Sequence, residues 1–239
     1  MTAWARAFSL HNKVKLVRMV QNGIRPEGIS HLLTSGLNKA AELRVLSLQD
    51  NTFTMPGAKA LAKALPGWTE LQELDVADCV LTGKGAGVLL PEAFAKGVNK
   101  KLEVLRLQYN DITATGLKKL TGVAETGLPG LKKLELNGNK FSEQDPSILQ
   151  LRDMFESRKE KFAGDVVMED DWGLDELDEL DDEDDEDEGS EEEEIEPEEL
   201  AEKLIKEAEE AQEEPTVQLK DKEVEELAKK LEQTEIKAG

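Results

Sequence analysis

The 239-residue sequence predicts an α/β solenoid of strand–helix repeats that is followed by a disordered acidic C-terminal tail. Three observations support this prediction. A motif of apolar residues recurs at a nearly constant period, a segment with helical spacing follows each copy, and the acidic residues are concentrated beyond the last copy. The formal net charge is −22, with residues 165–239 contributing −28 and residues 1–164 contributing +6.

The repeated motif has the form LxxLxLxx(N/C)x(L/I/F), and its copies are 28 to 31 residues apart. The first apolar positions of the five copies are Val14, Leu43, Leu71, Leu102 and Leu131. This motif and period are typical of a leucine-rich repeat solenoid. The repeat is long enough for a full helix, as in the ribonuclease-inhibitor type.

Within each copy, the period-2 alternation predicts a short strand. In the second copy, Leu46 and Leu48 are expected to point inward, while Ser47 and Gln49 line the concave face. The residue that follows each strand is expected to bond backbone groups in the turn, forming a structural ladder along the solenoid. The ladder positions are Asn22, Asn51, Cys79, Asn110 and Asn139. We interpret the Cys79 thiol as buried and inert.

Helices are expected after each turn. Pro26 and Pro56 suit the first helical position, where a missing N–H costs nothing, and Asp145 before Pro146 supplies an N-cap. Glycines recur six residues after four of the ladder positions, which predicts close approach of neighbouring backbones. These glycines are Gly28, Gly57, Gly85 and Gly116.

These elements divide the chain into four parts. Residues 1–13 are interpreted as the helix of a repeat whose strand is missing, and residues 14–162 as a solenoid with five parallel strands and a C-terminal capping helix. Strand 14–20 is then an uncovered apolar sheet edge. Residues 163–194 are predicted to be an acidic disordered tail, and residues 195–239 a Glu/Lys-rich, partly helical tail. In particular, residues 169–194 are expected to be disordered because their like charges repel.

Several function classes are excluded by composition. A polyanionic tail is the reverse of what a nucleic-acid binder needs. No apolar run reaches the roughly 18 residues that a membrane helix requires. One cysteine and two histidines cannot form a disulfide framework or a thiolate zinc site. We therefore expect no cofactor, no metal and no small-molecule substrate.

Four phrases of the sequence are specific beyond the generic repeat. They are MVQNGIRPEGI (19–29), LSLQDNTFT (46–54), LRLQYN (105–110) and LELNGNKFSEQD (134–145). With the acidic tail, they resemble the fungal-type Ran GTPase-activating protein family. The resemblance implies a crescent that docks on the GTP-bound form of the small GTPase Ran and accelerates hydrolysis, in support of nuclear transport. Activators of this family are not themselves hydrolases, because they position the glutamine and water of the GTPase. The expected location is the cytoplasm, with the nuclear periphery as a second place.

The resemblance also implies that the chain is N-terminally truncated. The Arg and Asn that are most associated with activation in the family lie in N-terminal repeats that nothing here matches. We therefore predict no catalytic residue in this sequence. The expected partner-binding residues are polar and lie at strand ends and in the following turns. They are Gln21, Arg25, Gln49, Asp50, Asp75, Asp78, Arg106, Gln108, Tyr109 and Asn137.

The tail has two interpretations. It is either a solvated polyanion or an electrostatic arm that steers a basic partner. Apolar residues among the acids suggest a short docking segment; they are Trp172, Leu174, Leu177 and Leu180. The alternative function is that of the acidic leucine-rich nuclear phosphoproteins, which bind histones without catalysis. Those proteins have shorter repeats with little full helix, so the 28–31 residue period favours the GTPase activator.

Overall fold

The strands of the protein are short and lie side by side in one parallel sheet, in the order of the sequence. The computed structural model describes residues 1–162 and 172–181. Within these residues the strands are β1 (Leu16–Arg18), β2 (Val45–Ser47), β3 (Glu73–Asp75), β4 (Val104–Arg106), β5 (Lys133–Glu135) and β6 (Gly173–Leu174). The α/β solenoid is therefore confirmed, and the five strands expected within residues 14–162 are present as β1–β5. The sixth strand, β6, lies beyond that range.

The central residues of successive strands are register partners and form the inner layer of the core. These residues are Val17, Leu46, Leu74, Leu105, Leu134 and Leu174. The first five are at most 4% exposed, and Leu174 is half-buried. The prediction that the repeats stack in register is confirmed, because one inward leucine per repeat fixes the pairing of the strands.

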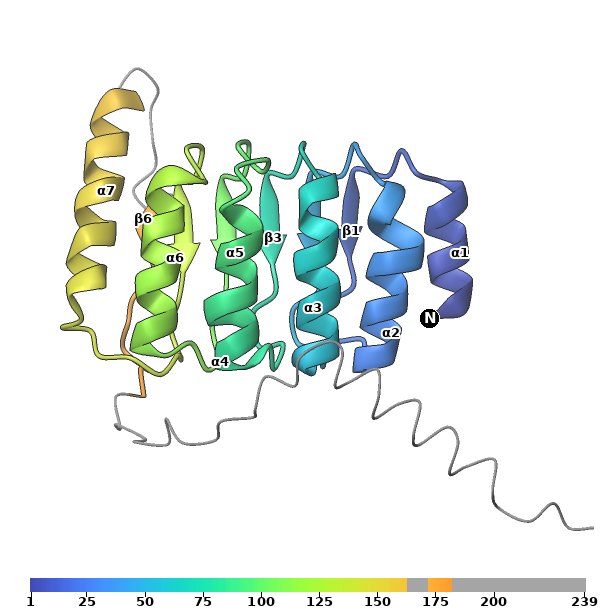
Figure 1. Cartoon of the computed structure of the whole chain (residues 1–239), viewed down its shortest axis with the longest axis horizontal. Coiled ribbons are helices and arrows are strands. Elements are labelled where there is room, and N and C mark those ends of the chain that lie inside the picture. The colour runs from blue at the N-terminus through green and yellow to red at the C-terminus, as the bar shows by residue number, and fades with distance from the viewer. Residues whose placement is uncertain (163–171, 182–239) are drawn as a thin grey trace, which may run out of the picture. The chain divides into compact units, whose positions relative to one another are not determined.

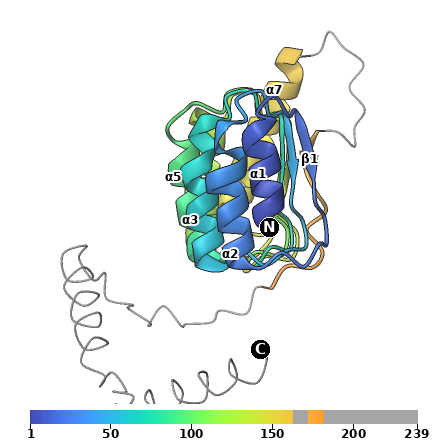
Figure 2. The same ribbon diagram turned by 90° about the vertical axis from the view of Figure 1, so that its right-hand side faces the viewer.

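Helices stand in a row along the sheet and cover one of its faces (Figures 1 and 2). They are α1 (Thr2–Leu10), α2 (Pro26–His31), α3 (Thr54–Ala64), α4 (Thr82–Lys84), α5 (Leu90–Phe94), α6 (Ala114–Thr126) and α7 (Pro146–Phe162). Short turns extend them, namely η1 (Leu32–Gly36), η2 (Leu37–Lys39), η3 (Leu65–Gly67) and η4 (Gly85–Leu89). The η4 turn is π-helical and joins α4 to α5 as one helical stretch. None of the described helices is long and apolar enough to cross a membrane.

Two glycines allow neighbouring helices to approach closely. A Cβ built on Gly87 would lie 2.8 Å from the Cα of Gly116, and the reverse distance is the same. Real side chains do not tolerate that distance, so the helical segments of the third and fourth repeats need glycine here. The expected close approach is present at Gly116, and its partner is Gly87.

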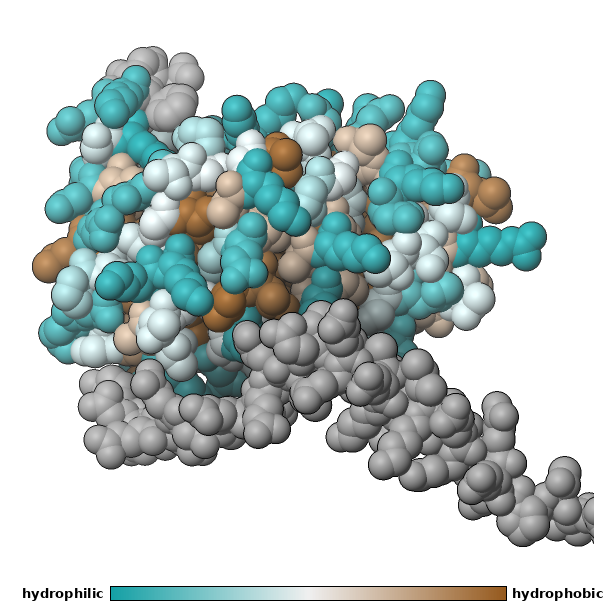
Figure 3. Space-filling model, viewed as in Figure 1, coloured by the Kyte–Doolittle hydropathy of each residue, from teal (hydrophilic) through white to brown (hydrophobic). Residues whose placement is uncertain are grey.

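The outward surface of the helices is mainly hydrophilic, with small apolar areas separated by polar side chains (Figure 3). The last helix, α7, buries Ile148, Leu151 and Phe155 against the preceding repeat. Its start is fixed by Asp145, whose Oδ1 accepts a hydrogen bond from the Ser147 amide at 2.7 Å.

The acidic segment corrects one prediction. Residues 172–181 lay within the stretch that we expected to be disordered, and that expectation is wrong for them. Gly173 and Leu174 pair with Lys133 and Leu134 as β6, so the segment adds a sixth strand to the sheet. The other residues of the predicted tails, 163–171 and 182–239, lie outside the described residues.

Candidate protein-interaction surface

The face of the sheet that the helices leave open carries a network of charged and polar side chains. Arg106 is its centre, with its guanidinium 2.6 Å from Glu73 and 3.1 Å from Glu135. Lys133 also contacts Glu135 at 3.1 Å, and Arg18 lies 3.7 Å from Glu73. Burial by itself would lower the pKa of Arg106, but the hydrogen bond to Glu73 and the charge of Glu135 raise it overall. The side chains of this face thus largely neutralise one another.

A second row of side chains lies where the strands end. Gln21, Asp50, Asp78 and Tyr109 occupy the same position in successive repeats, and all have left-handed backbone with φ of 50° to 56°. Gly138 occupies the position in the fifth repeat, with φ of 70°. We call these five residues the exit rim.

Backbone hydrogen bonds join the four non-glycine residues of the exit rim to the next repeat. The amide of Asp50 donates to Ala77, that of Asp78 to Gln108 and that of Tyr109 to Asn137, at 2.8 to 3.1 Å. Besides its left-handed backbone, the fifth repeat has a steric need for glycine at this position, because a Cβ on Gly138 would overlap the ring of Tyr109. The ring therefore lies over the backbone of the neighbouring repeat.

Asparagines beneath the exit rim connect the repeats. The Oδ1 of Asn110 accepts from the amides of Cys79 and Leu81, at 3.3 and 3.1 Å. Its Nδ2 donates to three carbonyls, including that of Val76 at 2.8 Å. Asn51 and Asn139 form equivalent sets of bonds. Asn22 differs, because it is exposed and its side chain donates only to Val20 among the described contacts.

The cysteine in the ladder is fully buried. Its Sγ lies 3.2 Å from the Leu48 carbonyl and 3.3 Å from the Ala77 carbonyl. Burial raises the pKa of the Cys79 thiol to about 12, with smaller effects from nearby backbone and carboxylates. The side chain remains a thiol at neutral pH and has no nucleophilic role.

The acidic segment is anchored at its start by half-buried contacts. The indole of Trp172 donates to the Phe155 carbonyl at 2.9 Å, and the amide of Gly173 donates to Lys132 at 2.8 Å. Asp175 then accepts from the amides of Leu136 and Asn137, at 2.7 and 3.0 Å. Burial raises the pKa of Asp175, and these two hydrogen bonds oppose that effect. The first half of the segment is therefore held much as a further repeat would be.

The second half of the acidic segment reaches the exit rim. Asn137 donates to Asp178 at 2.8 Å and accepts from the amide of Glu179 at 2.9 Å. The hydroxyl of Tyr109 donates to the Glu179 carboxylate, and this bond is the main cause of a raised pKa for Tyr109. These contacts are exposed, so the segment lies over two predicted partner-binding residues without burying them.

The predicted binding residues thus fall into separate groups. Gln21, Asp50, Asp78 and Tyr109 are brought together on the exit rim. The others lie elsewhere. Asp75 and Arg106 are the last residues of β3 and β4, and Arg25 is the residue before α2. Gln49, Gln108 and Asn137 directly precede exit-rim residues in the sequence.

The expected exposure is wrong for Asp75, which is only 7% exposed. Its carboxylate accepts from the Ser47 hydroxyl at 2.8 Å and from the Ala77 amide at 3.3 Å. Gln108 is also engaged, since its Nε2 donates to Glu135 at 2.5 Å. Both side chains stabilise contacts between repeats.

Sequence reasoning missed Asp175, Asp178 and Glu179 as parts of this surface. The available signal was the spacing of three leucines in the acidic stretch, at 174, 177 and 180. Among the described residues there is no group of three His, Cys, Asp or Glu side chains that could hold a metal ion.

Comparisons with known proteins agree with this architecture. The family model described as "Leucine Rich repeat" matches residues 42–62, 69–90 and 98–120, and the model "Leucine Rich Repeat" matches residues 130–151. A curated relative, Ran GTPase-activating protein 1 of Saccharomyces cerevisiae (strain ATCC 204508 / S288c), is 37% identical over 146 residues. The match covers 60% of this chain, and the chain spans 36% of the length of that relative. The protein therefore contains leucine-rich repeats and is similar, over these repeats, to Ran GTPase-activating protein 1.

Proposed function

We propose that this chain binds the small GTPase Ran in its GTP form, through the exit rim, as part of a GTPase-activating function. The observation that carries the proposal is the conjunction of the 37% identity with a row of polar side chains held in the same strained conformation. The similarity supplies the class of partner, and the row supplies a surface for it.

The backbone of the exit rim supports a role for its side chains. A left-handed conformation costs a non-glycine residue about 1–2 kcal/mol, and Asp tolerates it better than Gln or Tyr. Glycine would remove this cost, yet four of the five repeats keep a side chain. Backbone strain of this kind concentrates at functional sites.

The dimensions of the exit rim suit a protein partner. Neighbouring strands lie about 4.8 Å apart, so the four side chains span about 14 Å. Tyr109 is 47% exposed and combines an apolar ring with a polar tip, which is typical of residues that dominate binding energy at interfaces. On the open face beside it, the charges of Arg106 and Lys133 are already paired with those of Glu73 and Glu135, so this face needs no opposite charge from the partner.

We further propose that this chain binds Ran more than it activates it. Activation requires the glutamine and water of the GTPase to be held to within a fraction of an ångström. The Arg and Asn that the resemblance associates with that step have no counterpart among the side chains of the exit rim. Action on the cytoplasmic side of nuclear transport belongs to the same proposal.

The test measures binding and hydrolysis separately. Anisotropy with Ran carrying a fluorescent GTP analogue gives the Kd for the chain, for Asp78→Ala and for Tyr109→Ala. The matched control is Lys59→Ala, an exposed residue on the helical face. We expect each exit-rim variant to weaken binding about tenfold, as hot-spot residues do, and the control to leave it unchanged.

Single-turnover hydrolysis of Ran-bound GTP completes the test. Binding with little acceleration supports the proposal, and equal Kd values for all variants would refute it. Binding of core histones without binding of Ran would favour the histone-binding alternative.

A further inference from the structure

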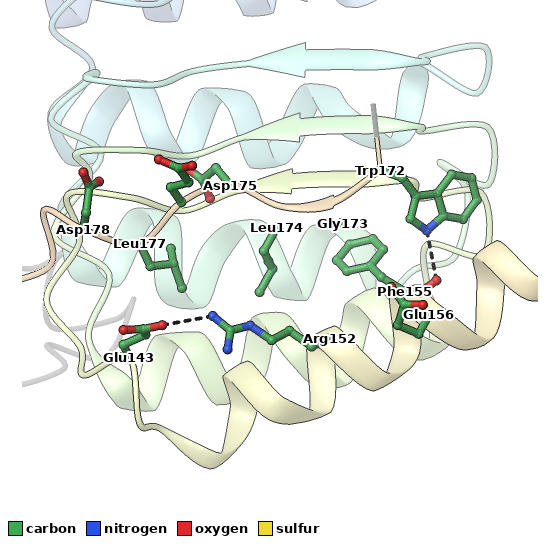
Figure 4. A pocket seen from close by; sticks show the side chains of 11 residues that line it. Glu143, Arg152, Phe155, Glu156, Trp172, Gly173, Leu174, Asp175, Leu177 and Asp178 are labelled. Carbon is green, nitrogen blue, oxygen red and sulfur yellow. Dashed lines mark hydrogen bonds and ion pairs between the residues drawn. The ribbon is translucent and has the colours of Figure 1, made fainter. Parts of the chain in front are cut away.

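A groove lies between helix α7 and the acidic segment (Figure 4). Its volume is about 730 Å³, within the range of sites that hold ligands. One wall is formed by Arg152, Phe155 and Glu156 of α7, and the other by residues 172–178. We propose that this groove binds a short basic peptide segment of a partner protein, one that carries an aliphatic side chain between lysines or arginines.

The apolar part of the groove is fixed in place. Phe155 is 2% exposed and belongs to the core, while Leu174 and Leu177 are half-buried against it. The Trp172 indole is held at one end by its hydrogen bond to the Phe155 carbonyl. An aliphatic side chain that enters the groove would therefore meet a preformed apolar surface, which lowers the entropic cost of binding.

Charge decides which peptide fits. Five carboxylates line the groove; they belong to Glu143, Glu156, Asp175, Glu176 and Asp178. The lining cation is Arg152, and its guanidinium is already paired with Glu143 at 3.1 Å. Asp175 is directed to two backbone amides and Asp178 accepts from the Asn137 side chain, which leaves Glu156 and Glu176 as exposed carboxylates at the opening. A ligand with lysines or arginines beside its apolar anchor complements this arrangement.

The adjoining parts of the same chain do not have the required chemistry. Residues 163–171 and 182–194 contain acids and no lysine or arginine. Residues 195–239 contain seven lysines against fifteen acids, so they are acidic on balance. A basic segment of another protein is therefore the better match.

The test uses the full chain and a labelled hexapeptide of two leucines and four lysines. The two exposed groove residues Glu156 and Glu176 are changed to lysine together. The control, Glu27→Lys with Glu92→Lys, makes the same change of net charge at exposed positions of helices α2 and α5, away from α7. We expect the groove variant to weaken binding at least about tenfold, and the control to weaken it much less, since distant charges are screened.

A second readout locates the bound peptide. With 5-fluorotryptophan incorporated, the chain has three ¹⁹F resonances, from Trp4, Trp68 and Trp172. We expect the peptide to shift the Trp172 resonance alone. Equal affinity of the groove variant and the control, no shift at Trp172, or no binding of the peptide would each overturn the proposal. Binding of Ran is measured independently, so either proposal can fail while the other stands.

Discussion

The two ends of the repeat stack are built differently. At the C-terminal end, β6 covers the edge of β5, and α7 covers the helix of the last full repeat. At the other end, β1 pairs with β2, and no described strand lies along its outer edge. Large apolar residues are exposed there, namely Trp4, Leu10, Leu16 and Val20.

This difference shows how a sheet edge is protected. Exposed edge strands invite pairing with other chains, and charges on the edge discourage it. The acidic segment adds only two strand residues and then continues as Asp175 and Glu176. A strand of another chain that approached this edge would therefore meet two carboxylates in place of an apolar surface. Four predictions test this contrast between covered and open ends.

The largest effect is expected in the ladder. Asn110→Ala removes five hydrogen bonds and leaves the buried amides of Cys79 and Leu81 without their acceptor, which should lower the free energy of unfolding by about 3 kcal/mol. Asn22→Ala at the open end should cost less than about 0.5 kcal/mol. Urea unfolding followed by circular dichroism measures both. Equal losses of unfolding free energy in the two variants would mean that the hydrogen bonds between repeats do not account for the stabilising effect of the ladder.

The next effect concerns Arg158 of α7. Its guanidinium donates to the carbonyls of Ala124, Leu128 and Leu131 at 2.7 to 3.0 Å, and so satisfies the end of α6. We expect Arg158→Ala to cost about 2 kcal/mol, and Arg158→Lys to recover only part of it, because one ammonium cannot reach all three acceptors. The exposed Arg152→Ala is the control. A loss as large at Arg152 would contradict this account.

A smaller effect is expected when the indole at each end is removed. Trp172→Ala should destabilise the docked acidic segment by about 1–2 kcal/mol, through lost burial and a lost hydrogen bond. Trp4 is 55% exposed, and Trp4→Ala should cost less than about 0.5 kcal/mol. Hydrogen exchange at the amides of Leu136 and Asn137 reports docking. Protection that survives Trp172→Ala would show that Asp175 alone holds the segment.

The smallest effect is a pH dependence of docking. Because burial raises the pKa of Asp175, the docked segment retains a proton at pH values where the free segment has lost it. Acidification into that window should therefore favour docking, by less than about 1 kcal/mol. The ¹⁹F resonance of Trp172 can be followed from pH 7 to pH 4. Release of the segment on acidification would contradict the assigned direction.

The repeats were predictable from sequence because each contains its own copy of the apolar motif. A leucine such as Leu105 must point inward in every repeat, so the period alone places the strands and the ladder. Asp75 was misjudged because its exposure depends on Ser47 in the preceding repeat, 28 residues away, which a pattern within one repeat does not show.

The sixth strand has no copy of this motif at the expected period. Leu174 follows Leu134 by 40 residues, outside the 28–31 residue period. Composition also pointed the wrong way, since a stretch of like charges usually remains unfolded. Two specific sets of contacts order it. The Trp172 indole donates to the Phe155 carbonyl of α7, and Asp175 accepts from the amides of Leu136 and Asn137, which follow β5. The positions of these partners are known only once the solenoid is folded.

The rate at which the buried cysteine is modified can report the opening of the repeat stack. Cys79 is the chain's only thiol, it lies at the centre of the ladder, and its raised pKa makes it unreactive while covered. A thiol reagent can therefore modify the native protein only during transient openings of the third repeat. At reagent concentrations where modification outpaces reclosing, the modification rate measures the rate of opening; at lower concentrations it measures the population of the open form. A ligand that binds only the closed repeat stack should slow the modification of Cys79, and the rate should fall as the occupancy of the ligand rises.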